Sequence, residues 1–187
     1  MNTPATKPHL SRQDWVEAGF NSLASNGPAA LRVEPLARVM GTTKGSFYWH
    51  FKDLGEFHAA MIAHWEAHAI TGIIDQLETE LKPAARLRKL VQLASTQSRS
   101  RHKGNNLEPS IRAWSRASDM AAQAVSRVDE QRLAYLAGLL AECGVTNPDL
   151  ARAIHAAVIG MADLSTRDGQ ANERAIGTLI DLILALR

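Results

Sequence analysis

Helical periodicity is the sequence feature that most constrains this chain. Apolar residues recur every three or four positions along most of the 187 residues, and this repeat is typical of α-helices that bury one side. Alternating runs of β-branched and aromatic residues, which indicate strands, are missing. Ser11 and Asp14 form a capping-box pattern before the first apolar stripe, and Gly27 ends that stripe. We therefore expect an all-α fold of about nine helices.

Start and stop signals predict three short helices followed by longer ones. After the first helix, a second is expected over residues 33–40, and a third begins at the natural N-cap Thr43. Asp53 and Glu56 form a further capping-box pattern at the start of a long helix. The expected helices from that point on cover residues 53–81, 84–98, 108–116, 119–143, 147–169 and 172–187, with a polar loop over residues 98–106.

The segment TTKGSFYWHFKD, residues 42–53, gathers four of the ten aromatic residues of the chain. On a helix, Phe47 and Phe51 share one face and are expected to point into a core. The other side mixes aromatic and basic residues, a combination that suits a nucleic-acid surface. The alternative interpretation is an aromatic core surrounded by solvated lysines. The outward stripe consists of Lys44, Tyr48 and Lys52, with Gly45 and Trp49 beside it.

Two short helices joined by a turn at residues 41–43 form the pattern of a helix-turn-helix. In this motif the second helix lies in the major groove of DNA, and its first residues reach the base edges. Gly45 removes a side chain near the start of that helix, so a phosphate or a base edge can approach the backbone. The free N–H groups of residues 43–46 favour an anion at the same place. We therefore predict a DNA-binding domain over residues 1–52 and a helical body over residues 53–187.

The stretch LARVMGTTKGSFYWHFKDLGEF resembles the helix-turn-helix of the tetracycline-repressor (TetR) family of bacterial transcriptional regulators. With the preceding segment WVEAGFNSLASNGPAALRVEPLA, the resemblance covers about residues 11–62. It implies a homodimeric protein that binds palindromic, double-stranded operator DNA, usually as a repressor, and that responds to a small-molecule effector. The single cysteine, the polar start of the sequence and the short apolar tracts lead us to expect a cytoplasmic location, at the nucleoid when the protein is bound to DNA.

The resemblance further implies roles for single residues of this segment. Arg32 stands where the family usually has a Ser or Thr cap, so it is expected to reach a phosphate without capping the second helix. Leu54 stands where a basic residue is frequent, which removes one expected phosphate contact. The residues expected to face the groove are Thr43, Lys44 and Trp49, and those expected at the phosphate backbone are Tyr48, His50 and Lys52, beside Thr42 and Gly45.

The last two expected helices carry an apolar surface for dimerisation. The final helix is apolar nearly all round and must be covered on several sides. In the family that the chain resembles, the last two helices pair with their twofold mates, and a twofold dimer sets two recognition helices about 34 Å apart. The alternative is a final helix covered by its own chain alone. The expected dimer residues are Ile154, Ala157, Val158, Met161, Ile176, Leu179, Ile180, Ile183 and Leu184, with Gly160 permitting close approach.

The same resemblance implies a ligand pocket inside the body, lined by the fourth to eighth helices. Aromatic and sulfur-containing residues there suit a flat, apolar ligand, although ordinary core packing accounts for the same residues. Asp163 and Arg112 are available to orient a polar group or to form ion pairs. His64 and His68 share a helix face as metal ligands do, but no third ligand is identifiable. The candidate pocket residues are Trp65, His68, Trp114, Met120, Tyr135, Leu139 and Met161.

Charge is unevenly distributed in a chain whose net charge is only +2. Residues 82–103 hold seven Lys or Arg residues and no acid, whereas residues 53–81 hold six acids and no Lys or Arg. The basic block over residues 82–103 has three interpretations: a solvated helix face, an addition to the DNA-facing field, or an attraction for an anionic ligand. The sequence does not decide among them.

Several observations bear on the class of protein. The single cysteine, Cys143, excludes an internal disulfide, and no apolar tract is long enough to span a membrane. No three-ligand metal motif, nucleophile elbow or phosphate-cradling glycine loop is present, so we expect neither an enzyme nor a cofactor. The alternatives are an interaction module whose aromatic segment binds protein, and a helical enzyme that uses His64, His68 or His155.

Overall fold

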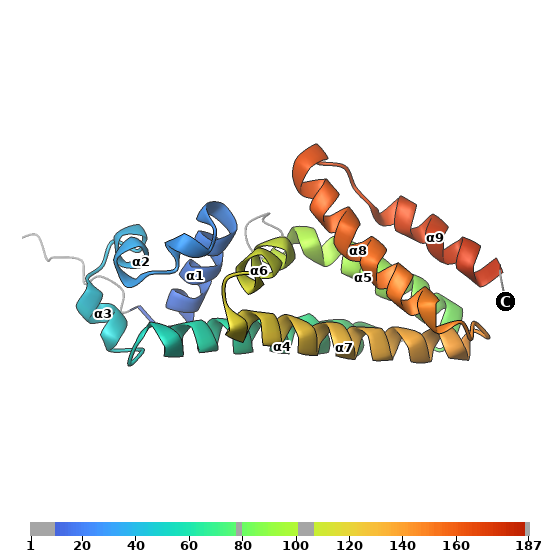
Figure 1. Ribbon diagram of the computed structural model, residues 1–187, viewed down its shortest axis with the longest axis horizontal. Helices are drawn as coiled ribbons and strands as arrows, with labels where there is room; N and C mark the ends of the chain where they lie inside the picture. The colour runs from blue at the N-terminus through green and yellow to red at the C-terminus, as the bar shows by residue number, and fades with distance from the viewer. Residues whose placement is uncertain (1–9, 78–79, 101–106, 186–187) are drawn as a thin grey trace, which may run out of the picture. The chain divides into compact units, whose positions relative to one another are not determined.

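The computed structural model of the protein describes residues 10–77, 80–100 and 107–185. Within these ranges the regular structure consists of nine α-helices and one short 3₁₀ helix, without a strand (Figure 1). The expectation of an all-α fold is therefore confirmed. The helices form two compact units, residues 1–61 and residues 62–187.

The first unit contains three short helices and the start of a long one. The predicted capping box is present, because the Ser11 side chain accepts from Asp14 N and the Asp14 carboxylate accepts from Ser11 N. Gly27 ends the first helix at a φ of 72°. The elements of this unit are α1 (Arg12–Asn26), the 3₁₀ helix (Pro28–Ala30), α2 (Val33–Val39), α3 (Lys44–Tyr48) and the first turns of α4 (Leu54–Leu77).

Phe47 of α3 is the centre of an aromatic core in the first unit. Its ring centroid lies 5.2 Å from that of Trp15 and 5.2 Å from that of Phe51. The ring of Phe57 lies 5.5 Å from Phe47 and 5.1 Å from Phe51. Tilted and edge-to-face contacts at these distances are favourable beyond the apolar area that they bury. Aromatic side chains from α1, from the segment after α3 and from α4 thus all contact Phe47 of α3.

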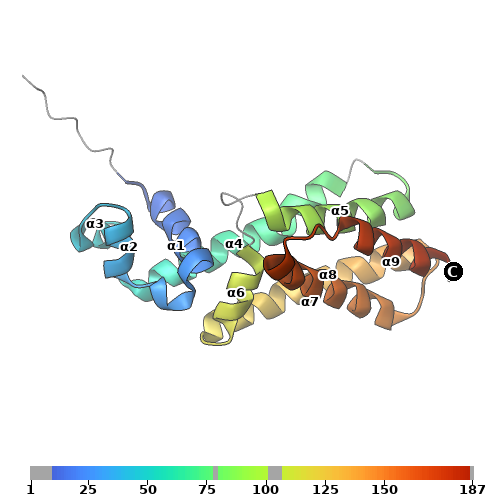
Figure 2. The ribbon, with the colours of Figure 1, turned by 90° about the horizontal axis from the view of Figure 1, so that it is seen from above.

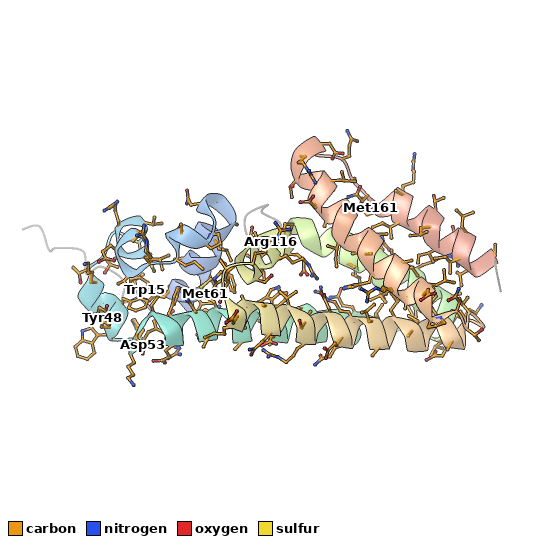
Figure 3. The ribbon with its side chains drawn as sticks, in the orientation of Figure 1. Trp15, Tyr48, Asp53, Met61, Arg116 and Met161 are labelled. Atoms are coloured by element: carbon orange, nitrogen blue, oxygen red, sulfur yellow. The ribbon has the colours of Figure 1, made fainter. Side chains whose placement is uncertain are left out.

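The first unit extends into α4, past the boundary expected at residue 52. Phe57 and Met61 are fully buried, and a Cβ on Gly19 of α1 would stand 2.7 Å from atoms of both side chains. The glycine therefore lets α1 and α4 approach each other closely. Figure 3 shows Trp15 and Met61 within this unit. The first two turns of α4 complete the aromatic core, which is why they belong to this unit.

The second unit consists of the rest of α4 and five further helices (Figure 2). Ser118 and Asn147 cap two of them, since their side chains accept from backbone N–H groups of the first turn. Gly169 ends the helix that Asn147 begins, in the left-handed conformation with φ at 67°. The five helices are α5 (Pro83–Ser100), α6 (Leu107–Ser115), α7 (Asp119–Glu142), α8 (Pro148–Asp168) and α9 (Glu173–Ala185).

The bounds of α4 and α5 differ from those expected. The described part of α4 ends at Leu77 rather than near residue 81, and Pro83 is the first residue of α5, where its missing N–H costs little. α5 continues to Ser100, so residues 98–100 of the expected polar loop are helical. The rest of that loop, residues 101–106, lies outside the described residues.

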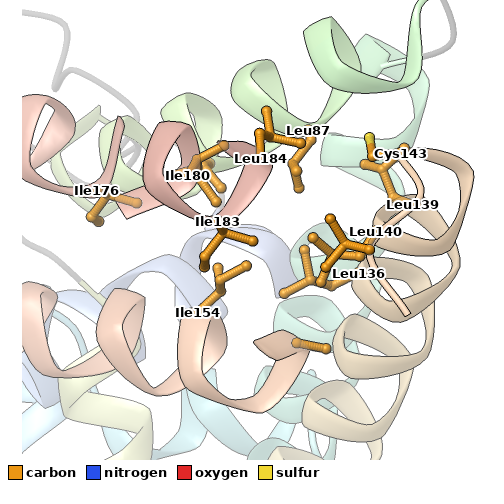
Figure 4. Close-up of a cluster of buried hydrophobic side chains, with 13 residues drawn as sticks. Leu87, Leu136, Leu139, Leu140, Cys143, Ile154, Ile176, Ile180, Ile183 and Leu184 are labelled. Carbon is orange, nitrogen blue, oxygen red and sulfur yellow. The ribbon is translucent and has the colours of Figure 1, made fainter. Parts of the chain in front are cut away.

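The core of the second unit is a cluster of aliphatic side chains from α5, α7, α8 and α9 (Figure 4). In the close-up, Ile154 of α8 faces Ile183 of α9, and both are at most 4% exposed. Burying a side chain of this size contributes roughly 1.5–3 kcal/mol. Four helices therefore share one continuous apolar contact, and α9 is covered on one side by its own chain.

Part of the basic block over residues 82–103 is neutralised by acids of neighbouring segments. The pairs are solvent-exposed to different degrees, so each contributes only about 0–1 kcal/mol. For the residues involved, the contacts favour ion pairs along a helix face over a free surface for DNA or an anionic ligand. The pairs are Arg86 with Glu142 at 3.4 Å, Arg88 with Asp181 at 2.8 Å and Lys89 with Glu80 at 3.6 Å.

A network of charged side chains joins α6, α7 and α8. Arg112 of α6 donates to both carboxylate oxygens of Asp129, at 2.9 and 2.6 Å, and to Glu108 at 2.8 Å. Arg132 of α7 donates to Glu108 at 2.9 Å. His155 of α8 lies 3.0 Å from Asp129, Nε2 to Oδ1. Because each carboxylate meets two nitrogen-bearing side chains, the charges compensate one another within the fold. Of the roles left open for Arg112, the described contacts support the ion pair.

The network lowers the pKa of both of its carboxyl groups. Burial raises the pKa of Glu108, but the guanidinium groups of Arg132 and Arg112 outweigh burial, and the net pKa lies below its usual value. Burial also raises the pKa of Asp129, but hydrogen bonds from Arg112 and His155 outweigh it and bring the pKa far below its usual range. A carboxylate with a lowered folded-state pKa stabilises the fold above its unfolded pKa. That contribution is lost as the pH falls through the folded pKa.

Replacing Asp129 by Asn tests this network. We expect Asp129→Asn to lower the free energy of unfolding near pH 7 by about 1–3 kcal/mol, because it removes charge-assisted hydrogen bonds. The loss of stability should be as large at about pH 5 as at pH 7, and smaller at about pH 3.5. The reason is that the stabilisation by the ionised Asp129 of the wild type decreases only below the unfolded-state pKa of about 3.9. Urea unfolding at the three pH values measures it.

Asp163→Asn is the matched control for this prediction. Asp163 is exposed and pairs with Arg167 on the same helix, so its replacement should change stability by less than about 0.5 kcal/mol. A deficit for Asp129→Asn that is equal at all three pH values, or no larger than that of the control, would contradict the account of the network.

Candidate nucleic-acid interface

The turn between α2 and α3 sets where α3 begins. Thr42 N donates to Ala37 O at 2.9 Å, and Gly41 takes a φ of 61°, a left-handed conformation that favours glycine. Thr43 then caps α3 as predicted, because its side chain accepts from Ser46 N. Two short helices joined in this way have the organisation of a helix-turn-helix.

Helix α3 and the residues after it present different faces to the core and to solvent. Phe47 is fully buried and Phe51 is 1% exposed, as their spacing predicted. Tyr48 is 56% exposed and Trp49 is 87% exposed, although both are large aromatic residues. In Figure 3, Tyr48 lies on the surface at the end of α3. The aromatic-core interpretation therefore accounts for Phe47 and Phe51 but leaves the exposed pair unexplained, and exposed apolar groups of this size indicate a binding surface.

Lys44 and Gly45 form the start of α3. Lys44 pairs with Glu34 of α2, and this hydrogen bond lowers the pKa of the Glu34 carboxyl. Both side chains of the pair remain more than half exposed, so a phosphate can compete for the ammonium group. A Cβ on Gly45 would meet only Thr43 Oγ1, at the ordinary contact distance of 3.5 Å. The packing of the chain itself therefore does not require a glycine at this position.

The other predicted DNA contacts lie around α3. Arg32 occupies the N-cap position of α2 without capping it, as predicted, and its Nε donates to Ala29 O at 3.1 Å. Leu54 is the first residue of α4, so no basic side chain stands at that helix start. The exposed members of the set are Arg32, Thr43, Lys44, Gly45, Tyr48, Trp49 and Lys52, and the partly buried members are Thr42 and His50.

Arg12 and Glu56, which the sequence did not indicate as site residues, contact the backbone on both sides of Phe51. Arg12 Nη1 donates to His50 O at 3.0 Å, and its guanidinium carbon lies 4.5 Å from the centroid of the Phe51 ring. Glu56 Oε2 accepts from Lys52 N at 2.8 Å, and Glu56 Oε1 pairs with Arg12 Nη1 at 2.9 Å. The capping pattern indicated Glu56 only as a helix-start residue. The role of Arg12 could not be predicted from its neighbours in the sequence, because its partner His50 lies 38 positions away.

This arrangement has the chemistry of a DNA-reading surface. Exposed lysine and tyrosine donate to phosphate oxygens, and such contacts position a protein on the duplex. Side chains at the start of a helix reach base edges when the helix lies in the major groove. Neither chemistry needs a cofactor.

The residues predicted to line a ligand pocket differ in their exposure. Three are at most 6% exposed, and two pack partly buried against the aliphatic core of the second unit. Met120 is 42% exposed because it is the second residue of α7, where the inward positions belong to Ala121 and Ala124. The buried residues are Trp65, Trp114 and Leu139, the partly buried ones are Tyr135 and Met161, and the exposed ones, which do not line an interior of the single chain, are Met120 and His68.

The residues predicted for dimerisation lie mostly in the core of their own chain. Periodicity identified the apolar stripes of α8 and α9, but not which stripe the chain itself covers. A different set of apolar positions, at helical spacing, remains exposed on both helices. Ile154, Ile176, Ile180, Ile183 and Leu184 are at most 5% exposed, and Ala157, Val158, Met161 and Leu179 are partly buried. The exposed set is Ala153, Ala156, Gly160 and Leu164 on α8 and Ala175, Leu182 and Ala185 on α9.

Histidines and acids form no recognisable metal centre in the described part of the chain, where no group of three or more such residues is arranged to hold an ion. His64 and His68 stack on α4 with ring centroids 4.1 Å apart, and His68 Nδ1 lies 2.7 Å from His64 O. His155 lies within hydrogen-bond distance of Asp129. Within the same described ranges, no helix combines the length and apolar character that crossing a membrane requires.

Comparison with known proteins gives partial sequence matches. No family model matches the chain. The transcriptional regulator AcuR of Cereibacter sphaeroides is 30% identical over 87 residues, which are 46% of this chain and 39% of AcuR. The HTH-type transcriptional regulator TtgR of Pseudomonas putida is 28% identical over 82 residues, which are 43% of this chain and 39% of TtgR. The chain thus spans about two fifths of the length of the curated relatives that it matches.

Solved structures are similar over nearly the whole chain. A TetR-like transcriptional regulator from Rhodococcus sp. RHA1 has a TM-score of 0.73 at 16% identity, covering 96% of each chain. SmeT, the repressor of the Stenotrophomonas maltophilia multidrug efflux pump SmeDEF, has a TM-score of 0.69 at 19% identity, covering 95% of this chain and 90% of SmeT. A transcriptional regulator from Saccharomonospora viridis in complex with choline has a TM-score of 0.74 at 14% identity, covering 93% and 95%. The resemblance to the TetR family is therefore confirmed, and the chain has the fold of the TetR-like transcriptional regulators.

Proposed function

We propose that the protein is a homodimeric DNA-binding transcriptional regulator of the TetR type that acts as a repressor on a palindromic operator. The observation that carries this proposal is the surface of α3 and its end, where Tyr48 and Trp49 are exposed beside Lys44 while Phe47 anchors the helix. The similarity to AcuR and TtgR, both transcriptional regulators, supports it. Such a protein works in the bacterial cytoplasm and joins the nucleoid when it binds DNA.

In this proposal, α3 enters the major groove of duplex DNA. Gly45 lets the backbone of α3 approach the groove closely. Phosphate contacts supply affinity that falls with salt, with a logarithmic slope of about 0.9 for each phosphate neutralised. The side chains that reach base edges are Thr43, Lys44 and Trp49, and those that contact phosphates are Tyr48, His50, Lys52 and Arg32, near Thr42.

The regulatory part of the proposal is a small-molecule effector bound in the second unit, near the buried Trp65 and Trp114. Buried aromatic side chains favour a flat, apolar ligand, and the similarity to a regulator in complex with choline supports a ligand in this fold. The effector lowers DNA affinity to the extent that it prefers the conformation that does not bind DNA. α4 has residues in both compact units, so it offers a continuous route between ligand and DNA.

Selection of duplex DNA from a random pool tests the proposal. We expect enrichment of a palindrome, because a twofold dimer presents two recognition helices. Lys44→Ala combined with Tyr48→Ala should abolish the enrichment and should leave the helical content measured by circular dichroism unchanged, since both side chains are exposed. An unenriched pool, with wild-type protein and double variant binding DNA equally, would rule out the regulator.

Gly45→Ala separates the fit to DNA from the stability of the fold. The chain has room for the methyl group, and alanine favours a helix over glycine by up to about 1 kcal/mol. We therefore expect the variant to be as stable as the wild type or more stable, yet to bind the selected duplex at least about tenfold more weakly, because the methyl group blocks approach of the backbone. Thermal unfolding and a binding titration measure the two effects. Unchanged affinity would exclude close approach at Gly45.

Dimerisation is expected to use the exposed stripes of α8 and α9. A Cβ on Gly160 would meet no atom of another part of the chain within 4 Å, and Leu182 is 62% exposed. Gly160→Glu and Leu182→Glu should therefore fold normally but raise the dimer dissociation constant at least about tenfold, through like charges brought together by the twofold axis. Sedimentation velocity measures the assembly. Ala137→Glu, at an exposed site of α7, is the control, and equal behaviour of all three variants would place the interface elsewhere.

A further inference from the structure

The first residue of α1, Arg12, carries a charge that is unfavourable at the start of a helix. Arg12 begins the helix, where the aligned peptide dipoles disfavour a positive charge. Within its own helix the residue therefore carries a cost. Its contacts lie elsewhere in the first unit, on His50, Phe51 and Glu56. A residue that is locally unfavourable and makes several long-range contacts indicates a role in holding those partners.

Arg12 and Glu56 together fix the chain on both sides of the buried Phe51. Arg12 donates to the carbonyl of His50 at 3.0 Å, and Glu56 accepts from the N–H of Lys52 at 2.8 Å. The two side chains pair with each other at 2.9 Å. The guanidinium also covers the Phe51 ring at 4.5 Å, a favourable cation–π distance. The backbone is thus held at His50 and at Lys52, and the side chain of Phe51 between them is held through its ring.

We propose that Arg12 and Glu56 form a clamp that positions His50 and Lys52 for the phosphate backbone of DNA, without touching DNA themselves. This inference rests on the proposed function, in which the side chains of His50 and Lys52 contact phosphates. Ordered donors bind a phosphate more tightly than mobile ones, because less conformational freedom is lost on binding. The clamp fixes the backbone from which both donors project.

The charge of Glu56 distinguishes this role from a simple electrostatic one. A carboxylate near a DNA surface repels phosphates, so on charge alone its removal should strengthen binding. The hydrogen bond from Lys52 N, and then that from Arg12, lowers the pKa of Glu56, so the carboxylate is ionised at neutral pH. If Glu56 acts by positioning, its removal should instead weaken binding. The two accounts predict effects of opposite sign.

Salt dependence distinguishes the clamp from a direct contact by Arg12. The Arg12 side chain is 50% exposed, so a contact with phosphate is the competing account. Loss of a phosphate contact reduces the slope of log K against log salt by about one, whereas loss of positioning alone weakens binding at an unchanged slope.

The experiment is a salt titration of binding to the selected duplex for the full-length wild type, Arg12→Ala, Arg12→Lys and Glu56→Gln. We expect Arg12→Ala and Glu56→Gln each to weaken binding roughly fivefold, as for the loss of charge-assisted hydrogen bonds, at an unchanged slope. The double variant Arg12→Ala/Glu56→Gln should bind DNA about as tightly as either single variant, because the two residues act as one unit. Arg12→Lys should recover part of the loss, since lysine can still pair with Glu56.

Two controls separate positioning from charge and from stability. Glu17→Gln removes the same charge from an exposed site of α1 and should leave binding unchanged or slightly tighter. Ser11→Ala removes the capping box of α1, which destabilises the same helix start without touching the clamp, and should leave affinity unchanged once the protein is folded. Tighter binding by Glu56→Gln, a slope reduced by about one in Arg12→Ala, or an equal loss in Ser11→Ala would each overturn the clamp. Failure of the wild type to bind the duplex would instead overturn the proposed function.

Discussion

The burial of Phe47 is the interaction on which the rest of the first unit depends. Its ring meets Trp15 from α1, Phe51 from the segment after α3 and Phe57 from α4. Because α3 has only five residues, one fully buried side chain is enough to fix its rotation. Tyr48 and Trp49 are then exposed beside it. The surface proposed for DNA is thus a consequence of a core contact.

Both units contain ion pairs that join segments distant in the sequence. In the second unit, Arg112 and Asp129 belong to a network that joins three helices and holds the pKa values of its acids low. In the first unit, Arg12 and Glu56 join the start of α1 to the chain after α3. In each case the charged groups are paired with opposite charges and hydrogen-bonded, which offsets the cost of taking them partly out of water.

Much of the fold was predictable from the sequence, and less of the site. Capping signals at Ser11 and Thr43 correctly indicated where helices begin, since a cap involves residues only a few positions apart. The inward faces of Phe47 and Phe51 followed from helical spacing. Periodicity could not tell that Ile180 is covered by its own chain while Leu182 is exposed, because both belong to an apolar helix whose neighbours are distant in sequence.

The sequence by itself therefore determined the helices, their caps and the composition of the segment that resembles a helix-turn-helix. These properties depend on residues within one or two turns of each other, where spacing and chemistry can be read directly. Only the tertiary structure decided that Arg12 reaches His50 across 38 positions, that Arg112 is an ion-pair residue, and which apolar faces remain open. Those features arise when distant segments meet, and no local pattern records which side chains will become neighbours.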